Sequence, residues 1–207
     1  MDLAASWQCF QYLNIRGRDY TCGDAQLSPL LMFGAQRGLI RFYNVLTLLL
    51  MNTHSLLNQS LINELLLEAQ ASPRLRKNRN FHVGDDAQCH RLANALQVDS
   101  YVHPHRHMNE HKAESMLMLA GELGVLIFDE AGQVIAKHHL KAGGEEYGIN
   151  IEAKTFHAVV ALTPCVFFEA KAGPYVPVAA NELATWAPKA DEAASVEYLA
   201  WMRSQFV

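Results

Sequence analysis

Residues 103–121, HPHRHMNEHKAESMLMLAG, are the part of this sequence that decides its fold. Side chains two apart on a strand point to the same face, so His105 and His107 can offer ring nitrogens to one point. Glu114 opens an apolar run that ends at a glycine, which is typical of a strand entering a turn. A further histidine, His157, lies in a later strand-like run. Three imidazoles and a carboxylate predict one site for a divalent transition metal rather than for calcium.

Two registers of this stretch are open. One takes His105, His107 and Glu114 as ligands, and the other takes His103, His105 and Glu110. Glu114 begins a predicted strand, whereas Glu110 lies in a polar stretch that reads as a loop. A strand holds a ligand more rigidly than a loop does, so we favour the first register and keep His103 and Glu110 in reserve.

The spacing resembles the first motif of the cupins, which has two histidines one residue apart, then a glutamate, then six residues and a glycine. The gap between His107 and Glu114 is longer than in the usual cupin motif. A closer resemblance is to the WbuC family of cupin-fold metalloproteins, and it runs from about Leu56 to the C-terminus. The motifs that carry it lie at residues 72–76, 78–82, 91–96, 105–114 and 168–175.

The second cupin motif departs from the family pattern. A proline and a glycine usually precede the last histidine ligand, but Glu152 and Lys154 stand at those places before His157. Without the glycine, the turn is built from residues that tolerate positive φ poorly. His157 is therefore the ligand whose geometry is least secure.

Short strand-like runs with turn signals and no helices between them predict an all-β fold. The cupin resemblance selects a small jelly-roll barrel with an N-terminal and a C-terminal helix. Ser60 is predicted to cap the first helix, which runs to Gln70, and Val196, Leu199 and Met202 to pack the closing helix, at 191–204, on the barrel. Met116 and Met118 share a face with Glu114 and are expected to line the barrel. The strands are predicted at 95–98, 101–107, 114–120, 124–128, 134–140, 149–151, 156–162 and 166–170, with a turn at 129–132.

Composition fits one soluble domain, since half of the 207 residues are apolar and 18% are charged. A net charge of −4 argues against nucleic-acid binding. The four cysteines stand far apart, which is unlike a disulfide scaffold or a zinc ribbon and favours a reducing cytoplasm. The apolar run 39–50 is shorter than the roughly 20 residues that a membrane helix needs.

Four segments are expected. Residues 1–50 read as a non-native or disordered extension, with translation starting at Met51, although a membrane-associating arm is the alternative. Residues 51–85 hold the first helix and a basic segment, 86–175 the cupin barrel, and 176–207 a tail and the closing helix.

The predicted function is a metal-dependent enzyme for a small polar molecule, with iron, manganese, nickel or zinc as the cofactor. The WbuC resemblance implies a sugar or related metabolite of surface polysaccharide (O-antigen) biosynthesis, and isomerase, hydrolase and dioxygenase chemistry are all open. A metal-dependent binding or sensing module is the alternative, and cupin barrels often form homodimers. Candidate catalytic residues are Glu169, Tyr175 and Glu110, and candidate substrate-binding residues are Arg74, Arg76 and Lys112.

Overall fold

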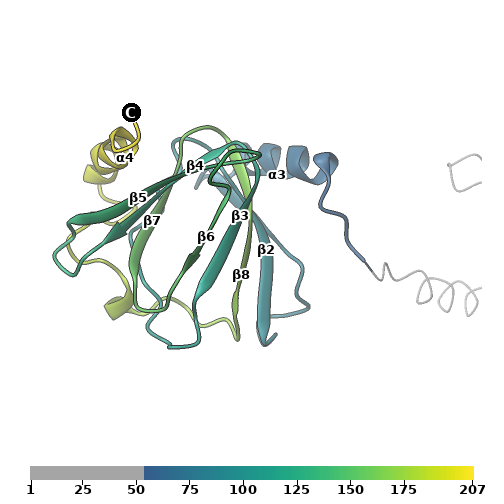
Figure 1. Cartoon of the computed structure of the whole chain (residues 1–207), viewed down its shortest axis with the longest axis horizontal. Coiled ribbons are helices and arrows are strands. Elements are labelled where there is room, and N and C mark those ends of the chain that lie inside the picture. Colours follow the sequence, from purple (N-terminus) through teal and green to yellow (C-terminus); the bar gives the residue numbers. More distant parts are fainter. Residues whose placement is uncertain (1–53) are drawn as a thin grey trace, which may run out of the picture. The chain divides into compact units, whose positions relative to one another are not determined.

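Two antiparallel sheets make up most of the computed structural model, which describes residues 54–207 (Figure 1). The predicted extension at 1–50 and the start at Met51 lie outside the described residues. One sheet has the strand order β1-β2-β8-β3-β6 and the other β5-β4-β7. The elements are α3 (Gln59–Ala71), β1 (Arg76–Asn80), β2 (Cys89–Leu96), β3 (Glu114–Ala120), β4 (Glu122–Phe128), β5 (Val134–Lys141), β6 (Gly148–Ile151), β7 (Phe156–Ala161), β8 (Cys165–Ala172), η1 (Ala180–Glu182) and α4 (Ala194–Ser204).

The strand order explains why the fold is a barrel rather than a meander. Most strands pair with partners far away in sequence, such as β2 with β8 and β4 with β7. The chain therefore crosses repeatedly between the sheets, and the inward side chains of both sheets meet in one core. The predicted all-β fold, a small jelly-roll barrel with one helix before its strands and one after them, is confirmed.

The N-terminus of helix α3 is capped by a side chain that accepts a hydrogen bond from one of its free amides. The Asn58 side-chain oxygen accepts a hydrogen bond from the Leu61 amide at 3.0 Å, so Asn58 is the cap and the predicted cap at Ser60 is wrong. Ile62, Leu65 and Ala69 are buried against β2 and β8. The predicted end of the helix before Pro73 is confirmed. The helix ends there because the residue before a proline avoids the helical region.

Helix α4 covers the other sheet, beside β7 (Figure 1). Leu199 and Met202 are buried as predicted, but Val196 is 72% exposed and does not pack on the barrel. The buried stripe of this helix is Ser195, Leu199 and Met202, at a spacing of four and three residues. Val196 is one residue from Ser195, so the helical turn carries it about 100° away from that stripe.

The predicted strands at 114–120 and 134–140, and those near 124–128, 149–151, 156–162 and 166–170, match observed strands to within two residues. The strand predicted at 95–98 is instead the eight-residue β2, and β1 was missed. The segment predicted as a strand at 101–107 forms only isolated bridges at His105. Pro104 has no amide hydrogen, which limits pairing in that segment. The turn at 129–132 is confirmed, with Gly132 at a φ of 84°.

No helix among residues 54–207 has both the length and the apolar character to span a membrane.

Candidate metal centre

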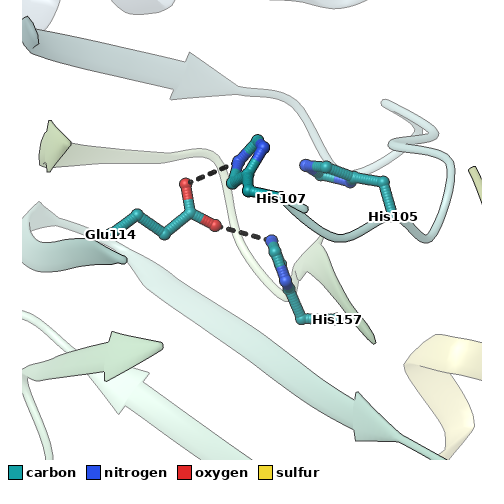
Figure 2. A group of neighbouring side chains, drawn as sticks. All are labelled: His105, His107, Glu114 and His157. Carbon is teal, nitrogen blue, oxygen red and sulfur yellow. Dashed lines mark ion pairs between the residues drawn. The ribbon is translucent and has the colours of Figure 1, made fainter. Parts of the chain in front are cut away.

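Four side chains from three separate segments converge inside the barrel (Figure 2). His105 and His107 lie on the loop before β3, Glu114 is the first residue of β3, and His157 is the second residue of β7. One ligand atom from each lies within 4.8 Å of those from the others. The Glu114 carboxylate is 2.6 Å from Nε2 of His157 and 3.5 Å from Nε2 of His107. The structure thus brings together the four residues predicted as metal ligands.

The ligand loop is fixed although it is not a strand. The His105 amide donates to the His157 carbonyl at 3.0 Å, and the His157 amide returns a bond of 2.9 Å to the His105 carbonyl. Between the two histidines, Arg106 stacks on the Phe156 ring at 4.1 Å and pairs with Glu130. The backbone pairing holds the loop in place, and Arg106 points away from the cluster. His105 and His107 therefore converge, as was predicted from the alternation of side chains along a strand.

Backbone carbonyls select the tautomer of two imidazoles. Nδ1 of His105 lies 3.0 Å from the His103 carbonyl, and Nδ1 of His157 lies 2.9 Å from the Thr155 carbonyl. A carbonyl only accepts, so Nδ1 carries a hydrogen in both rings, and Nε2 is the ring atom left to bind a metal. Metal-binding histidines are held in this way.

Buried atoms without hydrogen-bond partners test whether a metal fits. Within the described part of the chain, Nε2 of His107, Nε2 of His157 and Oε1 of Glu114 are buried and make no well-directed hydrogen bond. Such groups cost about 1–3 kcal/mol each when nothing pairs with them. All three face the same small volume, and together with His105 they form a donor set suited to a transition metal. The residues therefore fit a metal ion.

The electrostatics of the cluster keep its carboxylate ionised. Burial opposes ionisation of Glu114, but the neighbouring His107, His157 and Lys171 outweigh it and hold its pKa well below the usual range. Burial and the charge of His157 lower the pKa of His105 to about 3, which keeps that ring neutral. The pKa of His157 is raised despite its burial, because it lies against Glu114.

The alternative register is not assembled. The His103 ring contacts the carbonyls of Pro104 and Ala187 instead of the cluster. Glu110 is exposed and pairs with Lys154 at 2.8 Å. Both reserve ligands therefore lie outside the cluster. Glu110, which is also a candidate catalytic residue, does not face it.

The turn before His157 has a lysine in a strained conformation where the family motif usually has a glycine. Lys154 adopts a φ of 69°, which is the left-handed region that glycine usually occupies. Its amide donates to the His107 carbonyl at 2.7 Å, so the turn is tied to the ligand loop. Lys154 thus adopts the conformation expected of a glycine, and His157 still reaches the cluster.

Glu182, the last residue of η1, holds the ligand loop through hydrogen bonds. Its carboxylate accepts bonds of 2.8 Å from the amides of Met108 and Ala179, and its own carbonyl accepts from the Arg106 amide. We expect Glu182→Ala to weaken metal affinity about tenfold, the lower end of what loss of a supporting partner costs. Competition with a chromophoric chelator would measure this effect. An unchanged affinity would mean that the loop holds its shape without hydrogen bonds to Glu182.

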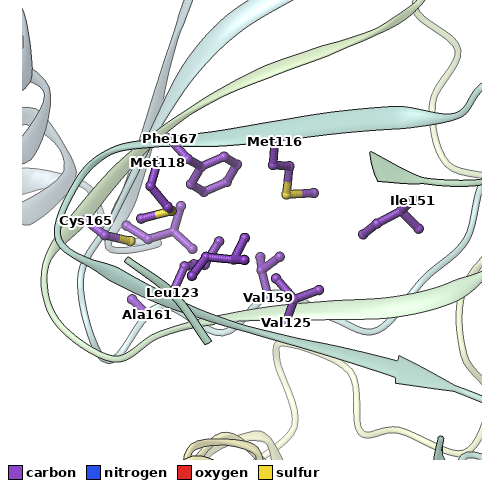
Figure 3. Packing of buried hydrophobic residues seen from close by; sticks show 11 residues of the cluster. Met116, Met118, Leu123, Val125, Ile151, Val159, Ala161, Cys165 and Phe167 are labelled. Carbon is purple, nitrogen blue, oxygen red and sulfur yellow. The ribbon is translucent and has the colours of Figure 1, made fainter. Parts of the chain in front are cut away.

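A small pocket opens beside His105, Glu114 and His157, three of the four ligands. It has a volume of about 170 Å³, and its apolar wall includes core residues Met116, Val159 and Phe167. Figure 3 shows these side chains in the core cluster, where Met116 and Met118 line the barrel as predicted. The remaining lining residues are Arg76, Asn94, Leu96, Val102, His105, Glu114, His157, Glu169 and Lys171.

A hydrogen-bonded chain of polar groups faces the ligands across this pocket. Nδ2 of Asn94 donates to Glu169 at 2.6 Å, and Nζ of Lys171 lies 2.6 Å from the other oxygen of Glu169. Lys171 also lies 3.7 Å from Glu114, its cross-strand partner on β3. The charges of Glu169 and Glu114 raise the pKa of Lys171 against the effect of burial, so it stays cationic.

The other predicted site residues lie in different places. Glu169 and Arg76 line the pocket, whereas Arg74 lines a separate cavity. Lys112 lies in the loop before β3, and Tyr175 is 57% exposed, with its amide bonded to the Asp85 carbonyl. None of these three is part of the pocket lining.

Two polar residues of the pocket were not assigned a role from sequence. Lys171 follows Glu169 by two residues, so strand alternation alone puts both on one face, and this signal was available. Asn94 lies in β2, which begins six residues before the predicted start of that strand at residue 95. Its hydrogen-bond partner Glu169 is 75 residues away in sequence. Only the pairing of β2 with β8 reveals that contact.

Residues 57–140, under half of the chain, match the model of a domain of unknown function, DUF6016. No curated protein matches the chain in sequence.

Similar solved structures include cupin-superfamily proteins. KdgF from Halomonas sp. has 15% identity and a TM-score of 0.39, over 51% of this chain and 84% of that one. A cupin superfamily protein from Desulfitobacterium hafniense has 13% identity and a TM-score of 0.38, over 47% and 76%. Oxalate decarboxylase from Lactobacillus farciminis has 22% identity and a TM-score of 0.37, over 48% of this chain but only 28% of that enzyme. The WbuC resemblance stays a prediction.

Proposed function

We propose that the chain is a cupin-type metalloenzyme that binds one divalent transition metal through His105, His107, Glu114 and His157. One observation carries the proposal. Buried nitrogen and oxygen atoms of these residues converge, without well-directed hydrogen bonds, at one end of a small pocket. Neutral imidazoles and one carboxylate suit iron, manganese, nickel or zinc.

The chain's own residues supply binding and proton transfer. A metal at this site would act as a Lewis acid toward an oxygen of the substrate. Four protein ligands leave two positions of a six-coordinate ion for the substrate or water. Glu169 faces the same pocket and is suited to accept a proton and return it. Lys171 and Asn94 hold the Glu169 carboxylate in place, and Arg76 offers a cation to an anionic group of the substrate.

The pocket limits the size of the molecule. A volume of about 170 Å³ equals that of about five or six liquid water molecules. It suits a small polar metabolite, or the reacting end of a larger one that extends into solvent. The proposal that this metabolite is a sugar of surface polysaccharide biosynthesis is supported by the WbuC resemblance alone. The spacing of the cysteines supports a cytoplasmic location.

A binding or sensing module is the second candidate. The compact ion pair between Lys171 and Glu169 favours it, because a tightly paired carboxylate can orient a ligand without taking a proton. Chemical turnover of a bound ligand, lost in Glu169→Gln while binding is kept, would decide for the enzyme.

Elemental analysis of the full chain, purified without added metal or a histidine tag, is the test. We expect near-stoichiometric metal in the wild type and less than about a tenth of it in His105→Ala/His107→Ala, because a metal site with two ligands is weak. The matched control is His138→Ala/His139→Ala, which removes two half-exposed histidines of β5 outside the cluster. Absence of metal from the wild type, even after reconstitution, would refute the proposal.

A further inference from the structure

A second and larger cavity lies apart from the metal centre. It has a volume of about 410 Å³ and is formed by the segment before β1, the loop before the ligand segment and one face of α4. Its lining meets that of the metal pocket only at Arg76. The lining residues are Pro73, Arg74, Leu75, Arg76, Asp99, Tyr101, Ala190, Ser195, Val196, Leu199, Ala200 and Arg203, and we call it the arginine cavity.

The charge of the arginine cavity is unbalanced. Three arginines and one aspartate line it, which leaves a surplus of two positive charges. The aspartate, Asp99, is 3.3 Å from Arg203 and is itself mostly exposed, so it neutralises that arginine only in part. Within residues 54–207, Arg74 and Arg76 have no ion pair with a carboxylate. By contrast, Arg79 on the same strand as Arg76 pairs with two glutamates.

Backbone carbonyls hold two of these guanidinium groups in place without neutralising them. Nη1 of Arg76 donates to the Tyr101 carbonyl at 2.7 Å, and Nη2 of Arg203 donates to the Val98 carbonyl. Nε of Arg203 is buried and has no hydrogen-bond partner in the described structure. Burial, and to a smaller extent the charge of Arg74, lowers the pKa of Arg76. Guanidinium groups that are held in place and only partly neutralised bind phosphate well.

The turn that carries Arg74 is strained. Leu75 adopts a φ of 55°, which a leucine rarely occupies, and hydrogen bonds with Ser72 and Gln97 hold it there. This conformation places Arg74 and Arg76 on the wall of the same cavity, even though they repel one another. Strain that brings like charges together fits a site that awaits an anion.

Most of the rest of the wall is apolar. Leu75, Leu199, Val196 and Ala200 offer a surface for a hydrocarbon part, and the Tyr101 ring adds to it. The volume lies within the range of about 300–1,000 Å³ that is usual for small-molecule sites. An occupant therefore needs a dianionic group and an apolar body.

We propose that the arginine cavity binds a phosphate monoester, with the phosphate between Arg74 and Arg203 and its organic part against α4. This site goes beyond the proposed metalloenzyme function, and it needs no metal. Arg76 lies between the two cavities, so a ligand here is a neighbour of the metal pocket rather than its substrate.

Isothermal titration of the full chain with phenyl phosphate and with inorganic phosphate, at constant ionic strength, tests the proposal. We expect phenyl phosphate to bind at least about fivefold more tightly than inorganic phosphate, because its ring buries apolar surface. Arg74→Gln and Arg203→Lys should each weaken phenyl phosphate about tenfold or more, through loss of a charged hydrogen-bonding group and of a planar fork. Arg74 is exposed, so its variant does not disturb the core.

Lys77→Gln is the matched control, since it removes one exposed positive charge three residues from Arg74. It should bind phenyl phosphate as the wild type does. His105→Ala/His107→Ala should also bind normally, which separates this site from the metal centre and keeps its outcome independent of the proposed function. Equal weakening in Lys77→Gln and Arg74→Gln would reduce the site to general charge attraction and overturn the proposal. Loss of binding only in the histidine variant would assign the phosphate to the metal.

Discussion

Glu114→Gln is expected to release the metal and to lower its affinity by more than about 100-fold, beyond the 10–100-fold cost of losing a supporting partner. Glutamine keeps the shape of the side chain but removes the negative charge that offsets the charge of the ion. Glu114 is buried with both oxygens against His107 and His157, so water has little room to take its place. Elemental analysis and titration of the apo-protein with zinc would measure the loss.

Glu110→Gln is the control for this variant, because it tests the other register of the same stretch. Glu110 is exposed and pairs with Lys154 outside the cluster, so its neutralisation should leave metal content unchanged. Circular dichroism should show both variants folded. If Glu110→Gln lost the metal and Glu114→Gln kept it, the ligand set would have to be rebuilt around His103.

The composition of the cluster was predictable from sequence because ligand spacing is a local signal. Glu114 at the start of an apolar run and two histidines one residue apart are visible without any tertiary information. The prediction of a strand at 101–107 was nevertheless wrong, and the histidines still converge. Their convergence depends on the backbone bridge between His105 and His157, which are 52 residues apart in the sequence.

Features that depend on distant pairing could not be predicted. The strand β1 reads RKNRN and has no apolar alternation, so only its pairing with β2 identifies it. Two basic residues of this region, Arg74 and Arg76, were predicted to bind the substrate. Both line the larger cavity, but only Arg76, on β1, also lines the metal pocket, while Arg79 on the same strand pairs with the glutamates of α3.

Gly121→Ala is expected to destabilise the fold by about 3 kcal/mol or more, which is the range of a serious backbone conflict. Gly121 is the single residue that connects β3 of one sheet to β4 of the other, and its φ is 74°. A β-carbon here would overlap the Pro164 carbonyl oxygen and lie 2.8 Å from Cα of Cys165. Those residues form the return crossing from β7 to β8, so neither backbone segment can move without disturbing both sheets.

Gly143→Ala separates the two causes of this effect. Gly143 has almost the same φ, 72°, but a β-carbon there would meet nothing within 4 Å. It should therefore cost only the left-handed conformation, about 1–2 kcal/mol. Urea unfolding of the two variants would give the difference directly, and that difference is the cost of crowding where the crossings meet. Similar losses in both would mean that the crossings yield easily, and that the barrel does not depend on close contact at this corner.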